Sequence, residues 1–338
     1  MRESSLHPGN KASIHEALRA LAAAEGKALD ETVERIYHPD ARWYGSHPIN
    51  ELKGTDAIKD VWHNVRRSFP DMERRDSIFL VGESGTKHYA ATIGIYQSNF
   101  VADWLGVPAT HGVAHLRYGE AHELVDGKII QTYALWDLLD LLRQAGIWPI
   151  APSLGAEVAW PAPATADGVR LGEEDSEHSA SSIALVLAMH QGLFRFDRRD
   201  LDSMQQHKYW TRNFLWYGPA GIGTARGMDG YRAHHQAPFL RAFPDRSGAG
   251  HFIDMGCGSY AVTGGWPSVQ ATHAGPGWLG LAATGKRVTM RVMDFYRIEN
   301  GLIAENWVPI DIIEALLQLG TDVLERVAHL RGRPNVRV

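Results

Sequence analysis

Cysteine is almost absent from the sequence, because Cys257 is the only one among 338 residues. A single cysteine excludes an intramolecular disulfide and any zinc site built from cysteines. The low cysteine content suits the reducing environment of the cytoplasm. We expect no other metal site, because His111 and His115, four residues apart in a predicted strand, are too far apart to chelate one metal.

Long apolar runs and blocks of one charge are also missing. No run reaches the roughly 18 apolar residues of a membrane-spanning helix, and the first residues, MRESSLHPGNK, lack the apolar core of a secretory signal. The 34 basic and 39 acidic residues are interleaved, which leaves a net charge of −5 and no basic surface for nucleic acid. We expect a soluble cytoplasmic protein whose partner is a neutral or weakly charged small molecule, with no nucleic acid and no membrane.

The composition is that of a globular protein. Hydrophobic residues make up 44% of the chain and charged residues 22%, so each half can bury a core. A length of 338 residues is typical of two domains rather than one.

An internal repeat supports two domains. Six blocks recur in the same order, at an offset of 173 residues in the first two and 174 in the others. The blocks are Trp43-Tyr44-Gly45 with Trp216-Tyr217-Gly218, LKGTDAI with ARGMDGY, Phe69-Pro70-Asp71 with Phe243-Pro244-Asp245, Trp104-Leu105-Gly106 with Trp278-Leu279-Gly280, VDGKI with ENGLI, and WDLLDLLRQAG with IDIIEALLQLG. A period this long indicates domain duplication rather than a solenoid.

The domain limits follow from the repeat. We predict a first domain over residues 10–150, a linker over 151–180 that is rich in proline and alanine, and a second domain over 181–328, with the boundary near Thr165.

Each copy is predicted to begin with helices and to continue with strands. Apolar residues at helical spacing, such as Ile14, Leu18 and Leu21, open the first copy. A second helix follows Gly54 or Gly227 and ends at Phe-Pro-Asp. Strand composition then dominates, and Asp126-Gly127 and Asn300-Gly301 are dipeptides typical of tight hairpins. A short apolar helix closes each copy.

This ordered set of segments, found twice, resembles the SnoaL-like polyketide cyclases of the nuclear transport factor 2-like superfamily, over about residues 13–147 and 183–325. The resemblance implies an α+β fold: two tandem cone-shaped domains, each a curved antiparallel sheet wrapped around helices and enclosing a deep apolar pocket. Members of the superfamily are cyclases, isomerases, dehydratases, hydrolases or ligand binders, and the fold alone does not choose among them.

The base of the cyclases is missing from this chain. The resemblance aligns that aspartate with Ala134 and Val308, neither of which can accept a proton. Asp137 and Asp311 lie three residues later, where we expect each to cap the closing helix.

Strand alternation indicates other carboxylates that face the pocket, since residues two apart share a face. Asp294 shares its face with apolar residues and Tyr296, and Glu120, 174 residues earlier, shares its face with Tyr118. A carboxylate on an apolar face has a raised pKa, which suits it to proton transfer next to a carbonyl. Asp294 and Glu120 are therefore the candidate acid/base residues, with His235, His63 or an aromatic hydroxyl orienting the carbonyl of the substrate. The alternative is that each carboxylate is simply hydrogen-bonded within the sheet.

Aromatic, histidine and amide side chains are the expected substrate contacts. In the first copy these are Trp43, Tyr44, His47, Trp62, His63, Trp104 and Tyr118, and in the second Trp216, Tyr217, Trp266, His273, Trp278, Tyr296 and Asn306. Core packing is the competing interpretation for the tryptophans and histidines.

Two functions remain open from the sequence. The first is an enzyme without a cofactor that acts by acid/base chemistry on a cyclic or aromatic small molecule, as a cyclase, isomerase, dehydratase or hydrolase. The second is a non-catalytic binding or accessory protein that uses the same pocket. The two copies are expected to form a pseudo-dimer within one chain, with a homo-oligomer as a further possibility.

Overall fold

The structure is a computed structural model that describes residues 6–158 and 160–332. It divides into two compact units. Unit 1 comprises Met1–Trp148, Ala162–Gly172 and Leu324–Val338, and unit 2 comprises Pro149–Pro161 and Glu173–Val323. Each unit is α+β and contains a curved, mostly antiparallel sheet with its helices, as expected.

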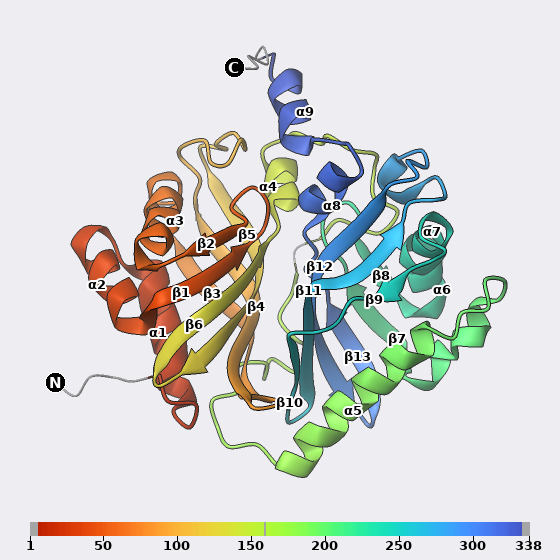
Figure 1. The fold of residues 1–338 in the computed structure, drawn as a ribbon, viewed down its shortest axis with the longest axis horizontal. Coiled ribbons are helices and arrows are strands. Elements are labelled where there is room, and N and C mark those ends of the chain that lie inside the picture. Colours follow the sequence, from red (N-terminus) through yellow and green to blue (C-terminus); the bar gives the residue numbers. More distant parts are fainter. Residues whose placement is uncertain (1–5, 159, 333–338) are drawn as a thin grey trace. The chain divides into compact units, whose positions relative to one another are not determined.

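In unit 1, three helices precede most of the strands in the chain. The amphipathic helices α1 and α3 bury residues such as Leu18, Ile58 and Trp62 against the strands, and Figure 1 shows α1, α2 and α3 on one side of the sheet. The six strands run in the order β2-β1-β6-β5-β4-β3. The elements are α1 (Lys11–Ala23), α2 (Gly26–Ile36), β1 (Tyr37–Gly45), β2 (Glu51–Lys53), α3 (Thr55–Ser68), β3 (Glu73–Ser84), β4 (Lys87–Asn99), β5 (Val113–Val125), β6 (Lys128–Trp136) and α4 (Leu138–Gln144).

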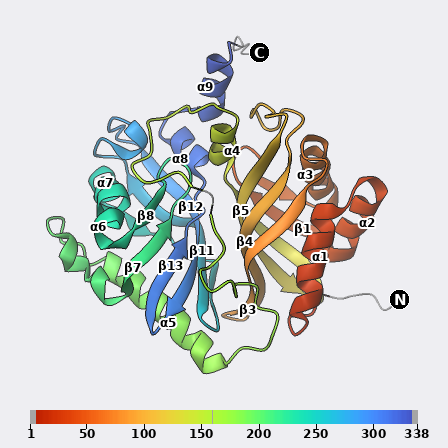
Figure 2. The same cartoon turned by 180° about the vertical axis from the view of Figure 1, so that it is seen from behind.

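Unit 2 repeats this plan in a seven-stranded sheet, whose main path is β10-β11-β12-β13-β7-β8, with β9 paired to β11. Figure 2 shows its helices and sheet from behind. The elements are α5 (Ser176–Leu193), η1 (Leu201–Met204), η2 (Gln206–Lys208), β7 (Trp210–Tyr217), β8 (Thr224–Arg226), α6 (Gly227–Tyr231), η3 (Arg232–Gln236), α7 (Ala237–Ala242), β9 (Ser247–Gly248), β10 (Ile253–Cys257), β11 (Tyr260–Thr272), η4 (Trp278–Gly280), β12 (Arg287–Glu299), β13 (Leu302–Trp307) and α8 (Ile312–Gln318). A last helix, α9 (Val323–Leu330), follows, and from Leu324 on it belongs to unit 1.

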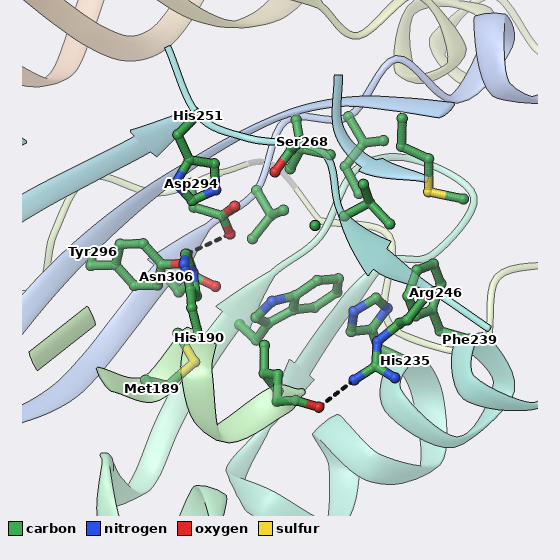
Figure 3. A pocket seen from close by; sticks show the side chains of 18 of the residues that line it. Met189, His190, His235, Phe239, Arg246, His251, Ser268, Asp294, Tyr296 and Asn306 are labelled. Carbon is green, nitrogen blue, oxygen red and sulfur yellow. Dashed lines mark hydrogen bonds between the residues drawn. The ribbon is translucent and has the colours of Figure 1, made fainter. Parts of the chain in front are cut away.

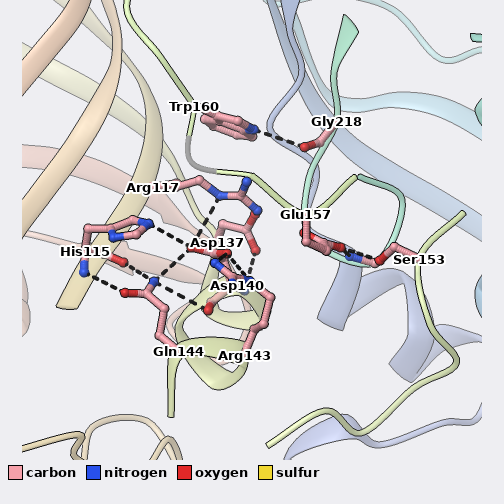
Figure 4. Close-up of polar contacts among 11 residues, drawn as sticks. His115, Arg117, Asp137, Asp140, Arg143, Gln144, Ser153, Glu157, Trp160 and Gly218 are labelled. Atoms are coloured by element: carbon pink, nitrogen blue, oxygen red, sulfur yellow. Dashed lines mark hydrogen bonds and ion pairs between the residues drawn. The ribbon is translucent and has the colours of Figure 1, made fainter. Parts of the chain in front are cut away.

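The segment between the two copies is shared by the units. Residues 149–161 belong to unit 2, where the Trp160 indole nitrogen donates to the Gly218 carbonyl at 3.0 Å (Figure 4). Residues 162–172 belong to unit 1, where the Phe79 amide donates to the Gly168 carbonyl at 2.9 Å. Helix α5 begins at Ser176, before the predicted end of the linker at residue 180.

The predicted hairpin turns are confirmed. Asp126 and Gly127 have φ of 49° and 76°, and Asn300 and Gly301 have φ of 50° and 75°. Positive φ at both central residues defines the tight turn whose twist matches that of the flanking strands. Each turn sets the register between a long strand and the strand that follows it.

The change of repeat offset from 173 to 174 coincides with a local irregularity. Between the repeated Gly-initiated helix and Phe-Pro-Asp, unit 2 has one residue more than unit 1, and here the helix passes through the π-helical turn η3. A π-helical turn absorbs one extra residue and is frequent at functional sites. His235 lies in this turn.

Candidate active site

A cavity of about 300 Å³ lies in unit 2 (Figure 3). Most of its wall is apolar or aromatic, with polar groups at a few points, which is the usual character of a small-molecule site. The lining residues are Met189, His190, Leu193, Phe194, Trp210, Trp216, Tyr231, His235, Phe239, Arg246, Gly248, Gly250, His251, Ser268, Val269, Met290, Val292, Asp294, Tyr296, Asn306, Val308 and Ile310.

Asp294 and its neighbours form one polar end of this cavity. Met290, Val292, Asp294 and Tyr296 all line it, so the predicted face of β12 is the inner face. Asn306 on β13 donates through Nδ2 to Oδ1 of Asp294 at 3.4 Å. The Tyr296 hydroxyl lies 2.8 Å from Nε2 of His190 on α5.

The protein environment shifts the pKa values of the titratable groups at this end of the cavity. Burial raises the pKa of Asp294 to about 6, although Asn306, His251 and Tyr296 each lower it. Burial lowers the pKa of His190 to about 4, so its ring is neutral at pH 7. Burial also disfavours the charged form of His251, but Asp254, at 2.6 Å, outweighs burial and raises its pKa. Asp294 is therefore a carboxylate that titrates near neutral pH at this end of the cavity.

His235 and Arg246 stand on the other side of the cavity in Figure 3. The His235 ring stacks on Trp216 with 4.2 Å between ring centroids, and burial together with Arg246 lowers its pKa to about 3. Nη2 of Arg246 donates to the Leu193 carbonyl at 2.7 Å. This side of the site thus presents a neutral imidazole and a cation.

The equivalent carboxylate of unit 1, Glu120, is held in a buried ion network. Arg74 donates to Oε2 of Glu120 at 2.8 Å and to Asp76 at 2.9 Å, and Tyr96 and Trp136 donate to Oε1 of Glu120 at 2.8 and 2.9 Å. Burial alone would raise the pKa of Glu120, but Arg74, His122 and Trp136 reverse the effect and lower it to about 2. Glu120 is therefore a permanent anion.

Aromatic rings fill the region beside Glu120. Trp62 packs edge-on against Trp43, Trp136 and Tyr96, with 6.0 to 6.2 Å between ring centroids. Trp43 and Trp62 are at most 1% exposed. These side chains form a packed core rather than the wall of a cavity.

Strand register and repeat offset identify the residue that replaces each of these groups in unit 2. Tyr96 pairs with Leu116, as Val269 pairs with Met290, and Tyr118 pairs with Trp136, as Val292 pairs with Ile310. The replacements are His235 for Trp62, Val269 for Tyr96, Ile310 for Trp136, Val292 for Tyr118, Gly248 for Arg74 and Gly250 for Asp76. All six replacements line the cavity. The space in unit 2 is therefore the volume that larger side chains occupy in unit 1.

Several predicted contacts of the first copy lie in other surroundings. Tyr44 stacks on Tyr133 at 4.8 Å, and the His47 ring lies 3.5 Å from the Asn50 amide. His63 is 42% exposed and lies 2.8 Å from Asp30. Trp104 packs against Phe69 and Trp136, and Tyr118 donates to Asp76 at 2.6 Å.

The predicted substrate contacts of the second copy also fall into two groups, those at the cavity and those elsewhere. Trp216, His235, Asp294, Tyr296 and Asn306 are brought together at the cavity. Four predicted contacts lie outside its lining: Tyr217 stacks on Trp307, Trp266 lies under Arg291, His273 lies 3.2 Å from the Thr284 hydroxyl, and Trp278 packs against Phe243.

Arg246, His190 and His251 line the cavity but were not expected from the sequence. For two of them, the sequence contains a feature that could have indicated a place in the site. His190 lies seven residues after Ile183, on the apolar stripe of α5, and Arg246 directly follows Phe-Pro-Asp, where the first copy has Met72. A polar residue at a position that is apolar in the other copy is a usable indicator of a site.

A family model identifies the family of this chain. The model of the SnoaL-like polyketide cyclases matches residues 15–145 and again 184–319. The chain belongs to this family. No curated protein matches.

Solved structures resemble about one copy of this chain. TsrD from Streptomyces laurentii is 19% identical, with a TM-score of 0.35, and the match covers 40% of this chain and 96% of TsrD. A nuclear transport factor 2-like protein from Burkholderia xenovorans LB400 is 12% identical, with a TM-score of 0.33, over 42% of this chain and 97% of that one. TerC, co-crystallised with polyporic acid, is 18% identical, with a TM-score of 0.31, over 42% of this chain and 100% of TerC.

Two aspartates that the chain shares with the SnoaL-like family, Asp137 and Asp311, cap the N-termini of the closing helices α4 and α8. Asp137 accepts from the Asp140 amide and Asp311 from the Glu314 amide, so both predicted caps are confirmed. Asp137 is also paired with Arg117, and Figure 4 shows this pair beside Asp140. Val308, aligned with the base of the cyclases, is part of the cavity wall.

No helix among the described residues is long and apolar enough to cross a membrane.

Proposed function

We propose that unit 2 is an acid/base enzyme without a cofactor and that Asp294 is its base. The carrying observation is a carboxylate with a pKa of about 6 on the wall of an apolar cavity. Such a pKa leaves the group ionised at neutral pH yet basic enough to take a proton, which is the compromise that general-base catalysis needs.

The proposed substrate is a cyclic or aromatic ketone held by the apolar wall. Asp294 removes a proton from the carbon next to the carbonyl, and the electron pair moves to the carbonyl oxygen to form an enolate. His251, which lines the same end and whose pKa is raised, is the candidate donor for the enolate oxygen. The proton then returns from Asp294 to another carbon in an isomerisation, or to the new alkoxide when the enolate carbon closes a ring on a second carbonyl.

We propose no chemistry for unit 1. A base must be able to take up a proton near neutral pH, and Glu120, with a pKa of about 2, does not. Its neighbours Trp62, Tyr96 and Trp136 leave the carboxylate 1% exposed. Unit 1 is proposed to be a structural copy.

The second candidate function is binding without turnover, and Val308 favours it, because the position aligned with the cyclase base is apolar. Proton abstraction separates the two candidates without knowledge of the natural substrate. In D₂O, an enzyme of the proposed kind exchanges the α-protons of a bound aromatic ketone such as 1-tetralone, which NMR detects.

We expect the wild type to accelerate this exchange and Asp294→Asn to lose at least about 100-fold of the acceleration, the usual contribution of a general base. Glu120→Gln changes the equivalent carboxylate of unit 1 and is the matched control, expected to exchange like the wild type while it is folded. Equal exchange by wild type and Asp294→Asn would refute the role of Asp294. Binding of 1-tetralone with exchange no faster than in buffer would favour the binding function.

A further inference from the structure

Arg246 is a cation in the wall of the unit 2 cavity with no acidic partner. Among the described residues, no Asp or Glu oxygen lies within 4.0 Å of its guanidinium, and its protein acceptors are the Leu193 carbonyl at 2.7 Å and the Met204 sulfur at 3.9 Å, both reached by Nη2. A guanidinium carries five N–H donors. Most of the donor capacity of Arg246 is therefore unused by the protein.

The buried arginines of the described chain contrast with Arg246, which is partly exposed. Each of them has an acidic partner: Arg66 pairs with Glu25, Arg74 with Asp76 and Glu120, Arg117 with Asp137, and Arg297 with Glu305. Pairing is the normal arrangement, because a charge removed from water costs free energy unless a partner compensates it. Partial burial accordingly lowers the pKa of Arg246, and no acidic partner among the described residues offsets this cost.

Packing does not require an arginine at this position either. Both copies carry Phe-Pro-Asp, and the next residue is Met72 in unit 1 and Arg246 in unit 2. Met72 is 4% exposed and serves as an ordinary core residue. The same backbone position therefore accepts an unbranched apolar side chain, and the charge of Arg246 is an addition that accompanies the open cavity.

The position of Arg246 indicates the polarity of the ligand. Figure 3 shows Arg246 beside Phe239 and His235, while Asp294, Asn306 and Tyr296 stand across the cavity. Trp216 and the stacked His235 ring lie along the wall. An occupant that satisfies both ends has a planar apolar body, an anionic group at Arg246, and its reactive carbonyl at Asp294.

We infer that the ligand of this cavity is an aromatic carboxylic acid whose carboxylate pairs with Arg246. The inference deepens the proposed function, since it names the class of substrate for the same site. A carboxylate accepts charge-assisted hydrogen bonds from the planar guanidinium, and such bonds are stronger than neutral ones. Because Arg246 holds the carboxylate away from Asp294, the two negative groups stay apart.

The test uses a pair of fluorescent probes that differ only in charge, 2-naphthoate and 2-naphthamide, titrated into the full chain at pH 7.5. We expect the wild type to bind 2-naphthoate at least tenfold more tightly than 2-naphthamide. Arg246→Met, which installs the residue of unit 1, is expected to bind both probes with the affinity that the wild type has for the amide. Arg246→Lys keeps the charge and is expected to keep part of the preference.

Controls separate this inference from the role of Asp294. Asp294→Asn, which fails in proton exchange if the proposed function is right, is expected to retain the preference for 2-naphthoate. An unchanged preference in Arg246→Met, or equal binding of both probes by the wild type, overturns the inference and leaves the base role of Asp294 intact. If Arg246→Met does not fold, Arg246→Gln makes the same comparison with a polar neutral side chain. Failure of the wild type to bind either probe would overturn the inference and count against the cavity as a binding site.

Discussion

Glu120 and Asp294 occupy equivalent positions, since each lies opposite a threonine of the neighbouring strand, Thr92 and Thr263. They differ in the residue that faces them. Arg74 lies 2.8 Å from Glu120, whereas the equivalent position in unit 2 is Gly248. The pKa is about 2 for Glu120 and about 6 for Asp294. Arg74 is the largest of the contacts that lower the pKa of Glu120, and its loss in unit 2 is the main electrostatic difference between this structural anion and Asp294.

Asp294→Asn should stabilise the protein at neutral pH. Burial raises the pKa of Asp294 from its ordinary 3.8 to about 6, so between these values the folded state binds more protons than the unfolded state, and stability falls as pH rises. Above pH 7 the full cost of the buried charge applies, which is about 1–3 kcal/mol at about 1.4 kcal/mol per pKa unit, after allowance for screening by water in the cavity.

Chemical denaturation of both proteins from pH 3.5 to 8 measures this effect. The two stability curves should run parallel below pH 4 and diverge between pH 4 and 6, with the variant above the wild type. Curves that stay parallel over the whole range would mean that Asp294 titrates normally and would remove the main support for its role as a base.

Gly248→Arg should convert Asp294 into a second Glu120. A Cβ at Gly248 meets only Phe194, at 3.4 Å, an ordinary contact, and Gly248 has no positive φ. By the register with β11, the new guanidinium stands where Arg74 stands in unit 1. An adjacent cation favours the ionised carboxylate, so the pKa of Asp294 should fall below 3.8. NMR titration of the Asp294 carboxyl carbon measures the fall, and a value still near 6 would contradict the electrostatic explanation.

The tandem fold could be predicted because the repeat makes each copy a check on the other. Asp126-Gly127 and Asn300-Gly301 fix two hairpins by local turn chemistry, and alternation along β12 places Asp294 and Tyr296 on one face without knowledge of the rest. These features depend on neighbours in sequence, which is why the pattern sufficed.

The difference between the copies could not be predicted from any one strand. Whether Glu120 is a base or a paired anion depends on Arg74, 46 residues earlier in the chain and on a different strand. Whether a tryptophan lines the cavity or packs in the core was equally open from the sequence. Trp43 and Trp216 match in the repeat, but they contact different neighbours, Trp62 and His235. The packing volume and the charge pairing of a core depend on side chains from several helices and strands, so they follow only from the three-dimensional arrangement.

Arg74→Met should destabilise unit 1. The change leaves Glu120 without its cation and removes one from Asp76, and breaking a buried ion pair from one side typically costs about 3–5 kcal/mol. Adding Glu120→Gln should recover part of this loss, because the amide carries no charge. A double-mutant cycle by chemical denaturation measures the coupling, and additive effects of the two substitutions would show that the pair does not interact energetically.

Filling the cavity with the residues of unit 1 should remove ligand binding. Trp136 and Trp62 occupy the positions of Ile310 and His235, so the double variant His235→Trp with Ile310→Trp is expected to weaken 2-naphthoate binding at least tenfold. Overpacking should cost only about 1–3 kcal/mol, because the space is already open.

The reverse change, Trp136→Ile, makes a hole in the packed core of unit 1 and removes a donor to Glu120, so it should cost about 3–5 kcal/mol and leave 2-naphthoate affinity unchanged. Fluorescence titration and chemical denaturation of the same samples measure both effects. Undiminished binding by the double variant would show that the probe binds outside this cavity.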